Sequence, residues 1–206
     1  MRNKKGITLI ALIITIIVML ILAVITINMI IGEDGIIKRA QEASKEFNRQ
    51  ARKEKILLED SIFITVNGNN HQVTGTTKQE MADIIVKNDL ETNYLTILVE
   101  IVNGKKIENI VYRYDLVTEE QRKKLEAEGI YRLKGDANKD GILDENDVSI
   151  IRNYIGYVID RNNEHIIQTC DMNNDGKILS SDTSILRDII GGIELGESIY
   201  KNEKNI

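Results

Sequence analysis

A 12-residue pattern that occurs twice constrains the fold of this chain more than any other feature. The first copy, Asp136–Asp147, reads DANKDGILDEND, and the second, Asp171–Asp182, reads DMNNDGKILSSD. Each copy has Asp at positions 1, 5 and 12, Asn at position 3 and Gly at position 6. Oxygen-bearing side chains at alternating positions let a short loop wrap one Ca²⁺, and the Gly permits a sharp turn. The sequence therefore predicts two calcium loops.

Both loops lead into similar segments, VSIIRNYIG after Asp147 and TSILRDIIG after Asp182. Their apolar residues recur at helical spacing, and Gly156 and Gly191 suit a helix end. No helical pattern immediately precedes either loop, so each copy is predicted to be a loop followed by one helix. The apolar faces of the two helices consist of Val148, Ile151 and Ile155 in the first copy, and Leu186, Ile189 and Ile190 in the second.

The duplicated loop and helix of residues 135–192 resemble a type I dockerin, an all-α module of cellulosome enzymes and related surface proteins. The resemblance implies two Ca²⁺ ions. The implied ligands of the first are Asp136, Asn138, Asp140, the Ile142 carbonyl, Asp144 through water, and Asp147; those of the second are Asp171, Asn173, Asp175, the Lys177 carbonyl and Asp182. Leu179 replaces Asp144 at position 9 and has no side-chain oxygen to offer.

The partner of a dockerin is a cohesin domain, so the resemblance also implies a docking surface. Its contacts come from loop positions 10 and 11 and from the following helix, which here are Glu145, Asn146, Arg152, Asn153, Ser180, Ser181, Arg187 and Asp188. The copies differ most at Glu145 and Ser180, which argues against interchangeable use of two faces. A purely structural metal module stays open as the alternative, because calcium binding can serve folding alone.

The N-terminal 31 residues predict a membrane anchor. Residues 7–31 contain no charged side chain and would form a helix about 37 Å long, enough to span a bilayer. Arg2, Lys4 and Lys5 precede this run, while Glu33 and Asp34 follow it. The positive-inside rule places the N-terminus in the cytoplasm and the remaining chain outside the cell. A cleavable signal peptide fits less well, because its apolar region is shorter and ends in small residues.

The junction KKGITLI, residues 4–10, resembles the leader of type IV prepilins and pseudopilins. That resemblance implies cleavage between Gly6 and Ile7 by a prepilin peptidase, with residues 1–6 as the leader. The family's Glu at the fifth mature position is replaced by Ala11, which weakens the case for fibre assembly. A plain signal anchor is the alternative.

Residues 32–134 predict a stalk helix followed by a small α+β region. Ile36, Ala40, Ala43, Phe47, Ala51 and Leu58 form an apolar stripe on residues 32–60, which we expect a sheet to cover. Across residues 61–134 we expect a small antiparallel sheet. Its predicted elements are a strand at 62–66 with a turn at Asn67-Gly68, a helix capped at Thr77, a hairpin of 94–102 and 107–114 around Asn103-Gly104, a helix from Thr118 to Gly129, and a strand at 130–133.

Composition and motifs favour a binding protein over an enzyme. The 135–190 segment has 11 acidic and 5 basic residues, and no basic patch indicates nucleic acid binding. Catalytic motifs are missing, His71 is expected at the surface, and Glu100, Glu108 and Asp115 are expected on a solvated sheet face. Cys170 has no second cysteine to pair with and is expected to be a packed thiol. The rival interpretations are a component of polysaccharide breakdown and a pilus subunit.

Overall fold

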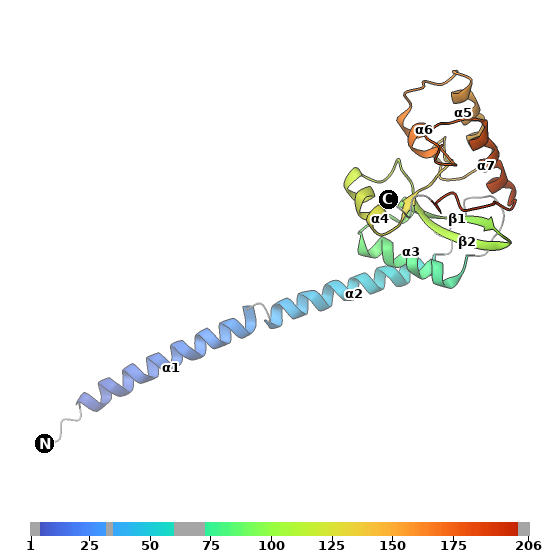
Figure 1. Ribbon diagram of the computed structural model, residues 1–206. Coiled ribbons are helices and arrows are strands. Elements are labelled where there is room, and N and C mark those ends of the chain that lie inside the picture. Colours follow the sequence, from blue (N-terminus) through green and yellow to red (C-terminus); the bar gives the residue numbers. More distant parts are fainter. Residues whose placement is uncertain (1–4, 32–34, 60–72, 202–206) are drawn as a thin grey trace. The chain divides into compact units, whose positions relative to one another are not determined.

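The computed structural model describes residues 5–31, 35–59 and 73–201. The chain divides into two compact units, Met1–Arg52 and Lys53–Ile206. Figure 1 labels the helices and strands used below. The predicted strand at 62–66, its turn at Asn67-Gly68 and His71 lie outside the described residues.

Helix α1, Lys5–Ile31, contains the apolar run of the first unit. Its segment Leu9–Ile30 is long and apolar enough to cross a membrane, a test that a signal sequence also passes. The hydroxyls of Thr15 and Thr26 donate to carbonyls within the helix, at 2.8 and 2.7 Å. Internal bonds of this kind satisfy polar groups that a bilayer would leave without partners. Gly6 and Ile7 lie in the first turn of α1.

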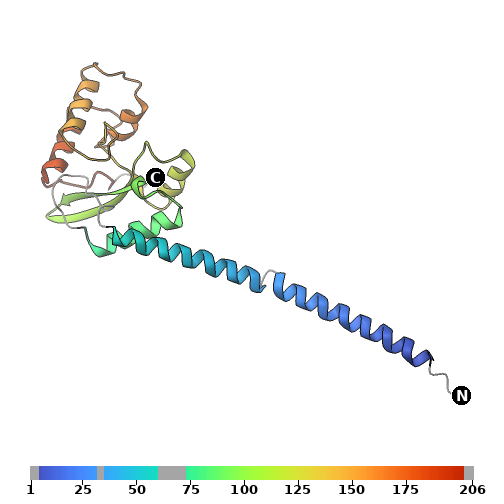
Figure 2. The ribbon, with the colours of Figure 1, turned by 180° about the vertical axis from the view of Figure 1, so that it is seen from behind.

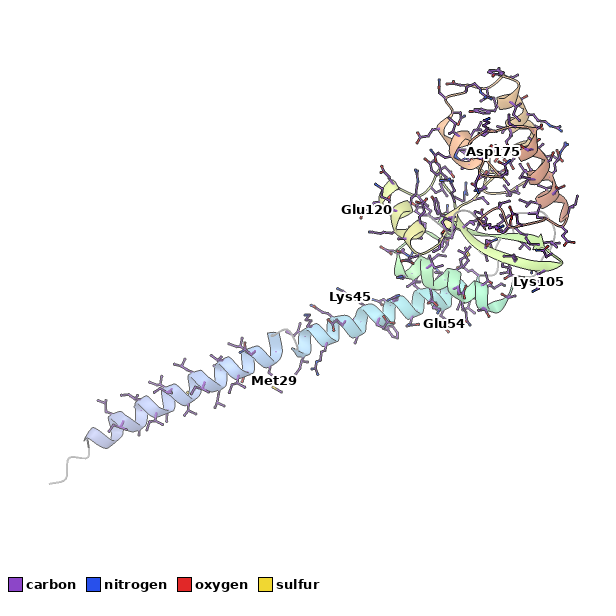
Figure 3. All side chains as sticks on the ribbon, viewed as in Figure 1. Met29, Lys45, Glu54, Lys105, Glu120 and Asp175 are labelled. Atoms are coloured by element: carbon purple, nitrogen blue, oxygen red, sulfur yellow. The ribbon has the colours of Figure 1, made fainter. Side chains whose placement is uncertain are left out.

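Helix α2, Ile36–Leu58, begins in the first unit and ends in the second. Ile36, Phe47 and Leu58 of the predicted stripe are exposed. The buried residue of α2 is Ile56 instead. Figure 3 shows the α2 side chains on the ribbon, with Lys45 and Glu54 labelled.

The sheet is mixed, which corrects the prediction of an antiparallel one. Strands β1, Leu95–Val102, and β2, Lys105–Tyr112, pair in antiparallel register around Asn103 and Gly104, whose φ angles are 50° and 69°. Those values fit the predicted tight turn. Strand β3, Tyr131–Arg132, runs parallel to β2 because helix α4, Glu119–Ala127, carries the chain back before β3 begins.

Two longer helices and a short turn complete the α+β region. Helix α3, Gly75–Lys87, is capped by Thr74, whose hydroxyl accepts from the Thr77 amide; the predicted cap at Thr77 is therefore three residues late. A 3₁₀ turn, η2, covers Thr92–Tyr94. Helix α4, Glu119–Ala127, has the predicted capping box at Thr118.

Both faces of β1 are buried, and a separate apolar core forms on each face. Alternate residues Leu95, Ile97 and Val99 join the core that contains α3 and α4. Leu98 and Val102 join the core of the loop-and-helix module. Figures 1 and 2 show α3 on one side of the sheet and the three helices of residues 145–191 on the other. The predicted boundary between 134 and 135 therefore lies inside a shared core.

The C-terminal module contains three helices: α5, Glu145–Ile155; α6, Glu164–Thr169; and α7, Ser180–Gly191. Val148 and Ile151 of α5 are buried with Leu186 and Ile189 of α7, as their spacing predicts. Helix α6 was not predicted and leads directly into the second loop. Its buried face includes Ile166.

Residues 193–206 are predicted to be a tail in which Ile193 and Leu195 dock back; in the described part Leu195 is bound to the sheet, whereas Ile193 is 55% exposed. The Leu195 amide donates to the Ile101 carbonyl at 2.7 Å, and Leu195 bridges to Val102. Glu100 is buried, not solvated, and accepts from the Ile199 amide at 2.9 Å and the Ser198 hydroxyl at 2.7 Å. We call residues 195–201 the C-terminal strap.

Candidate calcium loops and docking faces

The first loop folds around the carboxylate of its last residue, Asp147, which is fully buried at the start of α5. Its Oδ1 accepts from the amides of Ala137 and Asn138, at 2.8 and 3.1 Å. Its Oδ2 accepts from the Asp144 amide at 2.9 Å. One side chain thereby joins the beginning and end of the loop.

The second loop has the same arrangement around Asp182, which is also fully buried. We call this arrangement, in which the carboxylate at position 12 accepts three backbone hydrogen bonds, the loop frame. Oδ1 accepts from the amides of Met172 and Asn173, at 2.9 and 3.4 Å, and Oδ2 accepts from the Leu179 amide at 2.8 Å. The short Asp at position 12 reaches the same backbone donors in both copies. The duplication in sequence is thus a duplication in hydrogen bonding.

Positions 1, 3 and 5 shape the middle of each loop. In the first, the Gly141 amide donates to Asp136 Oδ2 at 3.1 Å and the Ile142 amide to Asp140 Oδ1 at 2.8 Å. Asn138 Oδ1 accepts from the Asp140 amide at 2.9 Å. The same three contacts recur in the second loop, between Gly176 and Asp171, Lys177 and Asp175, and Asp175 and Asn173, at 2.8 to 3.0 Å.

Asp136 Oδ1 is buried and has no hydrogen-bond partner among the described residues. Burial raises the pKa of Asp136 to about 7, with a further rise from the nearby Asp147 charge and an opposing effect from Arg113. Burial also raises the pKa of Asp147 to about 6, against the three backbone amides that favour its ionised form. A hard divalent cation would relieve both effects, so this donor set fits Ca²⁺.

The loops hold oxygen donors in place but form no closed cage. No group of three or more His, Cys, Asp and Glu side chains stands ready to hold a metal within the described ranges. Ca²⁺ takes six to eight oxygens, and carbonyl and amide oxygens count among them. Asp140, Ile142, Asn173, Asp175 and Lys177 are exposed, while Asn138, Asp144 and Asp171 are half-buried. Asp144 caps α5 by accepting from the Asn146 amide at 2.8 Å.

Two side chains from outside the first loop hold its backbone. Arg113, just after β2, donates from Nη2 to the carbonyl of Lys139, the residue at loop position 4, at 2.5 Å. His165 of α6 lies 2.5 Å from the Asp136 carbonyl through Nε2, so Nε2 carries the proton. Burial lowers the pKa of His165, which keeps the ring neutral. These contacts tie the first loop to the sheet and to α6.

In the second loop, a lysine side chain contacts the residue at position 4, where an arginine does so in the first. Buried Lys134 donates to Oδ1 of Asn174, the residue at position 4, and to the Ile199 carbonyl at 3.3 Å. Asn174 in turn donates to the Ile199 carbonyl at 3.2 Å. The second loop is thus tied to the C-terminal strap.

The calcium-loop pattern does not predict these contacts of Arg113, Lys134 and His165. Arg113 and Lys134 follow strands and carry no local signal of a loop contact. For His165 a signal existed: Asn163 followed by Glu164 is typical of a helix start, and Asn163 Oδ1 accepts from the Ile166 amide at 3.2 Å. Cys170, by contrast, is buried as predicted, which raises the pKa of its thiol to about 12.

Seven of the eight predicted contact residues are exposed, and Asp188 is half-buried. Arg187 of α7 donates to Glu145 at the start of α5, at 3.1 Å. The beginning of α5 therefore lies beside the second half of α7. Glu145 and Arg187 thus form one face, and the repeat, which aligns Arg152 with Arg187 and Ser180 with Glu145, implies a second face with Arg152 and Ser180.

Comparison with known protein families decides the nature of this module. Residues 134–190 match the family model described as Dockerin type I domain. The C-terminal part of the chain therefore carries a dockerin type I domain. Dockerins bind calcium and dock to cohesins, which agrees with the loop frames and exposed faces described above. Searches of the curated proteins and of the solved structures gave no match.

Proposed function

We propose that this protein is a calcium-binding, membrane-anchored protein that docks a cohesin-type partner outside the cell. The observation that carries the proposal is the dockerin type I match over two loops with the same hydrogen-bond frame. The exposed positions at the ends of these loops supply a surface for a protein partner. Docking then serves scaffolding or adhesion.

Each loop binds one Ca²⁺ in this proposal, giving two ions. The residues that would hold them are those at positions 1, 3, 5 and 12, with the carbonyls of Ile142 and Lys177. Calcium supplies positive charge where burial disfavours the ionised form of Asp136. The protein's own residues do the positioning, because Asp147 and Asp182 already bring both ends of each loop together.

Helix α1 anchors the module in the membrane in this proposal. Its length, its apolar Leu9–Ile30 segment and the preceding positive charges support a single span with the C-terminal part outside. Cleavage by a prepilin peptidase between Gly6 and Ile7 is the finer form of the proposal. Mass spectrometry of the protein from its host membrane tests this, since cleavage removes residues 1–6 and Gly6→Val should retain them.

We further propose that the protein is not an enzyme. The carboxylates of Glu100, Glu108 and Asp115, on and next to the β1–β2 hairpin, have structural partners. Glu100 binds the strap, and Glu108 accepts from the Thr74 amide at 3.1 Å and from Lys106 at 2.8 Å. Burial opposes ionisation of Glu108, but contacts from Lys106, Thr77 and Thr74 outweigh it and lower its pKa to about 2. Arg113 pairs with Asp115 at 3.6 Å.

The test is capture of the full-length protein, in detergent, by a panel of immobilised recombinant cohesin domains. We expect capture in millimolar calcium and its loss in excess chelator. The double variant Asp136→Ala with Asp171→Ala should also lose capture. Glu194→Ala, which removes an exposed carboxylate outside both loops, is the control and should bind normally. Capture that survives chelation, or no capture by any cohesin, would contradict the proposed function.

A further inference from the structure

Helices α5 and α7 end with the same backbone motif but with different residues at its critical position. The Tyr157 amide donates to the Tyr154 carbonyl at 3.2 Å and the Val158 amide to the Asn153 carbonyl at 2.8 Å. After α7, Gly192 and Ile193 make the equivalent bonds to Ile189 and Asp188, at 3.1 and 2.7 Å. Both are Schellman ends, which need a residue in the left-handed conformation.

Glycine fills that position after α7 and tyrosine fills it after α5. The φ angles are 64° at Gly192 and 61° at Tyr157. A bulky side chain is disfavoured there, and burial does not compensate because Tyr157 and Val158 remain 77% and 75% exposed. Strained, exposed aromatic residues are typical of binding sites.

The Tyr157 ring is held in place by its neighbour Arg161. The Arg161 guanidinium lies 4.7 Å from the ring centroid of Tyr157 and 4.4 Å from that of Tyr154. Arg161 also donates to the Tyr154 carbonyl at 3.0 Å. The loop between α5 and α6 lies at the end of the module farthest from the sheet (Figures 1 and 2). Tyr157 is thus an exposed aromatic side chain held against Arg161.

The two faces also differ in the pairing of their charged side chains. Glu145 and Arg187 neutralise each other on one face. The repeat places Ser180 where Glu145 stands and Arg152 where Arg187 stands, so the position equivalent to Glu145 supplies no carboxylate to Arg152. Arg152 is exposed. On this face the guanidinium of Arg152 is exposed to a partner, whereas on the first face the guanidinium of Arg187 is paired with Glu145.

The first face is also closer to the rest of the protein. Asp188 lines a groove of about 280 Å³ with Glu194 and the strap. Immediately after α7, the chain turns to the sheet, where Leu195 pairs with Ile101. At the end of α5 no strap of this kind is found among the described residues, so a partner can approach freely.

We infer that the dockerin domain uses one face only, formed by the end of α5, Tyr157 and Val158, and the start of α7. This inference rests on the proposed function and narrows it. The partner it fits is a folded domain with an apolar pocket for Tyr157 and Val158 and a carboxylate at the pocket rim for Arg152. Ser180 and Ser181, the first residues of α7, add two exposed hydroxyls to this face.

The test measures affinity of the full-length protein, in detergent and calcium, for the recombinant cohesin domains used above. Tyr157→Gly removes the ring and suits the backbone, so we expect unchanged or higher thermal stability with at least tenfold weaker binding. Arg152→Ala should weaken binding severalfold. Val158→Ala and Ile193→Ala change equivalent positions after α5 and α7. Only Val158→Ala should weaken binding.

Each outcome separates the inference from the function on which it rests. Normal binding by Tyr157→Gly overturns the single-face inference but leaves calcium-dependent docking intact. An equal loss with Ile193→Ala and Val158→Ala also overturns it. If the unmodified protein binds no cohesin domain in calcium, the proposed function fails, and the inference fails with it.

Discussion

The two calcium loops share one frame but have different surroundings. In both, the last Asp is fully buried and accepts from three backbone amides. The first Asp differs: Asp136 is 2% exposed with an unpartnered oxygen, whereas Asp171 is half-buried with both oxygens bonded. The loop pattern therefore specifies the hydrogen bonds within each loop. The neighbouring elements determine how deeply the aspartate at position 1 is buried, and so how unfavourable its ionised form is.

The difference originates in the elements that pack against each loop. The first loop is held by Arg113 after β2 and by His165 of α6. The second loop is held by Lys134, whose ammonium also binds the strap. Two nearly identical ligand sets are thereby placed in unlike electrostatic environments. Four pairs of variants test this comparison.

The largest effect should come from the shared frame. Asp147→Ala and Asp182→Ala each leave three buried backbone amides without acceptors, at about 1–3 kcal/mol apiece. We expect each to lower the free energy of unfolding by about 5 kcal/mol, measured by urea denaturation in calcium. Asp160→Ala, an exposed control, should stay within about 0.5 kcal/mol. A small loss in either loop would show that the frames are not equivalent.

In the metal-free protein, the aspartates at loop position 1, Asp136 and Asp171, should affect the pH dependence of stability differently. The folded pKa of Asp136, about 7, lies above the 3.8 of an unfolded chain, so the folded state binds more protons between these values. Stability in chelator should therefore fall as pH rises from about 4 to about 7, by roughly 3 kcal/mol. Asp136→Asn should flatten this slope and Asp171→Asn should not. Equal slopes in all three proteins would refute the difference in burial.

The two cationic side chains that contact the residue at loop position 4 should have smaller effects on stability, each confined to its own loop. Arg113→Met removes the contact to the first loop, and Lys134→Met removes the contact to the second. Each should lower the free energy of unfolding by about 1–2 kcal/mol. Amide chemical shifts of Gly141 should respond to the first variant and those of Gly176 to the second. A response of both loops to one variant would show that the loops are coupled.

The glycines at position 6 should give the smallest contrast. Both have positive φ, 81° at Gly141 and 80° at Gly176, so Ala strains each by about 1 kcal/mol. A methyl at Gly141 would also lie 3.0 Å from Arg113 Nε, while one at Gly176 would meet no atom within 4 Å. Gly141→Ala should therefore cost about 0.5 kcal/mol more than Gly176→Ala in thermal denaturation. The reverse order would contradict the placement of Arg113.

Local features of this fold were predictable because they depend on neighbouring residues. Alternation and the turn at Asn103-Gly104 predicted the β1–β2 hairpin, and the Thr118 box predicted the start of α4. The buried α5 and α7 faces followed from helical spacing. Helix α6, with 6 residues, is too short for that spacing to stand out.

Long-range features were not predictable because their partners are distant in the chain. Glu100 alternates with apolar residues as a solvated side chain would, yet Ile199 and Ser198 bury it from 99 and 98 residues away. The parallel β3 pairing depends on how α4 returns the chain. For the site, the sequence located the loops but not their unequal burial, since Arg113, Lys134 and the strap carry no calcium-loop pattern.

We expect two ions to bind, one at each of two loops with different surroundings, and to organise the docking module. Isothermal titration of the metal-free, full-length protein in detergent with calcium tests it most directly. We predict two ions bound, with one site lost in Asp136→Ala and the other in Asp171→Ala. We also predict proton release near neutral pH that is reduced by Asp136→Ala and not by Asp171→Ala. One ion in the unmodified protein, or loss of both sites in either variant, would contradict the account.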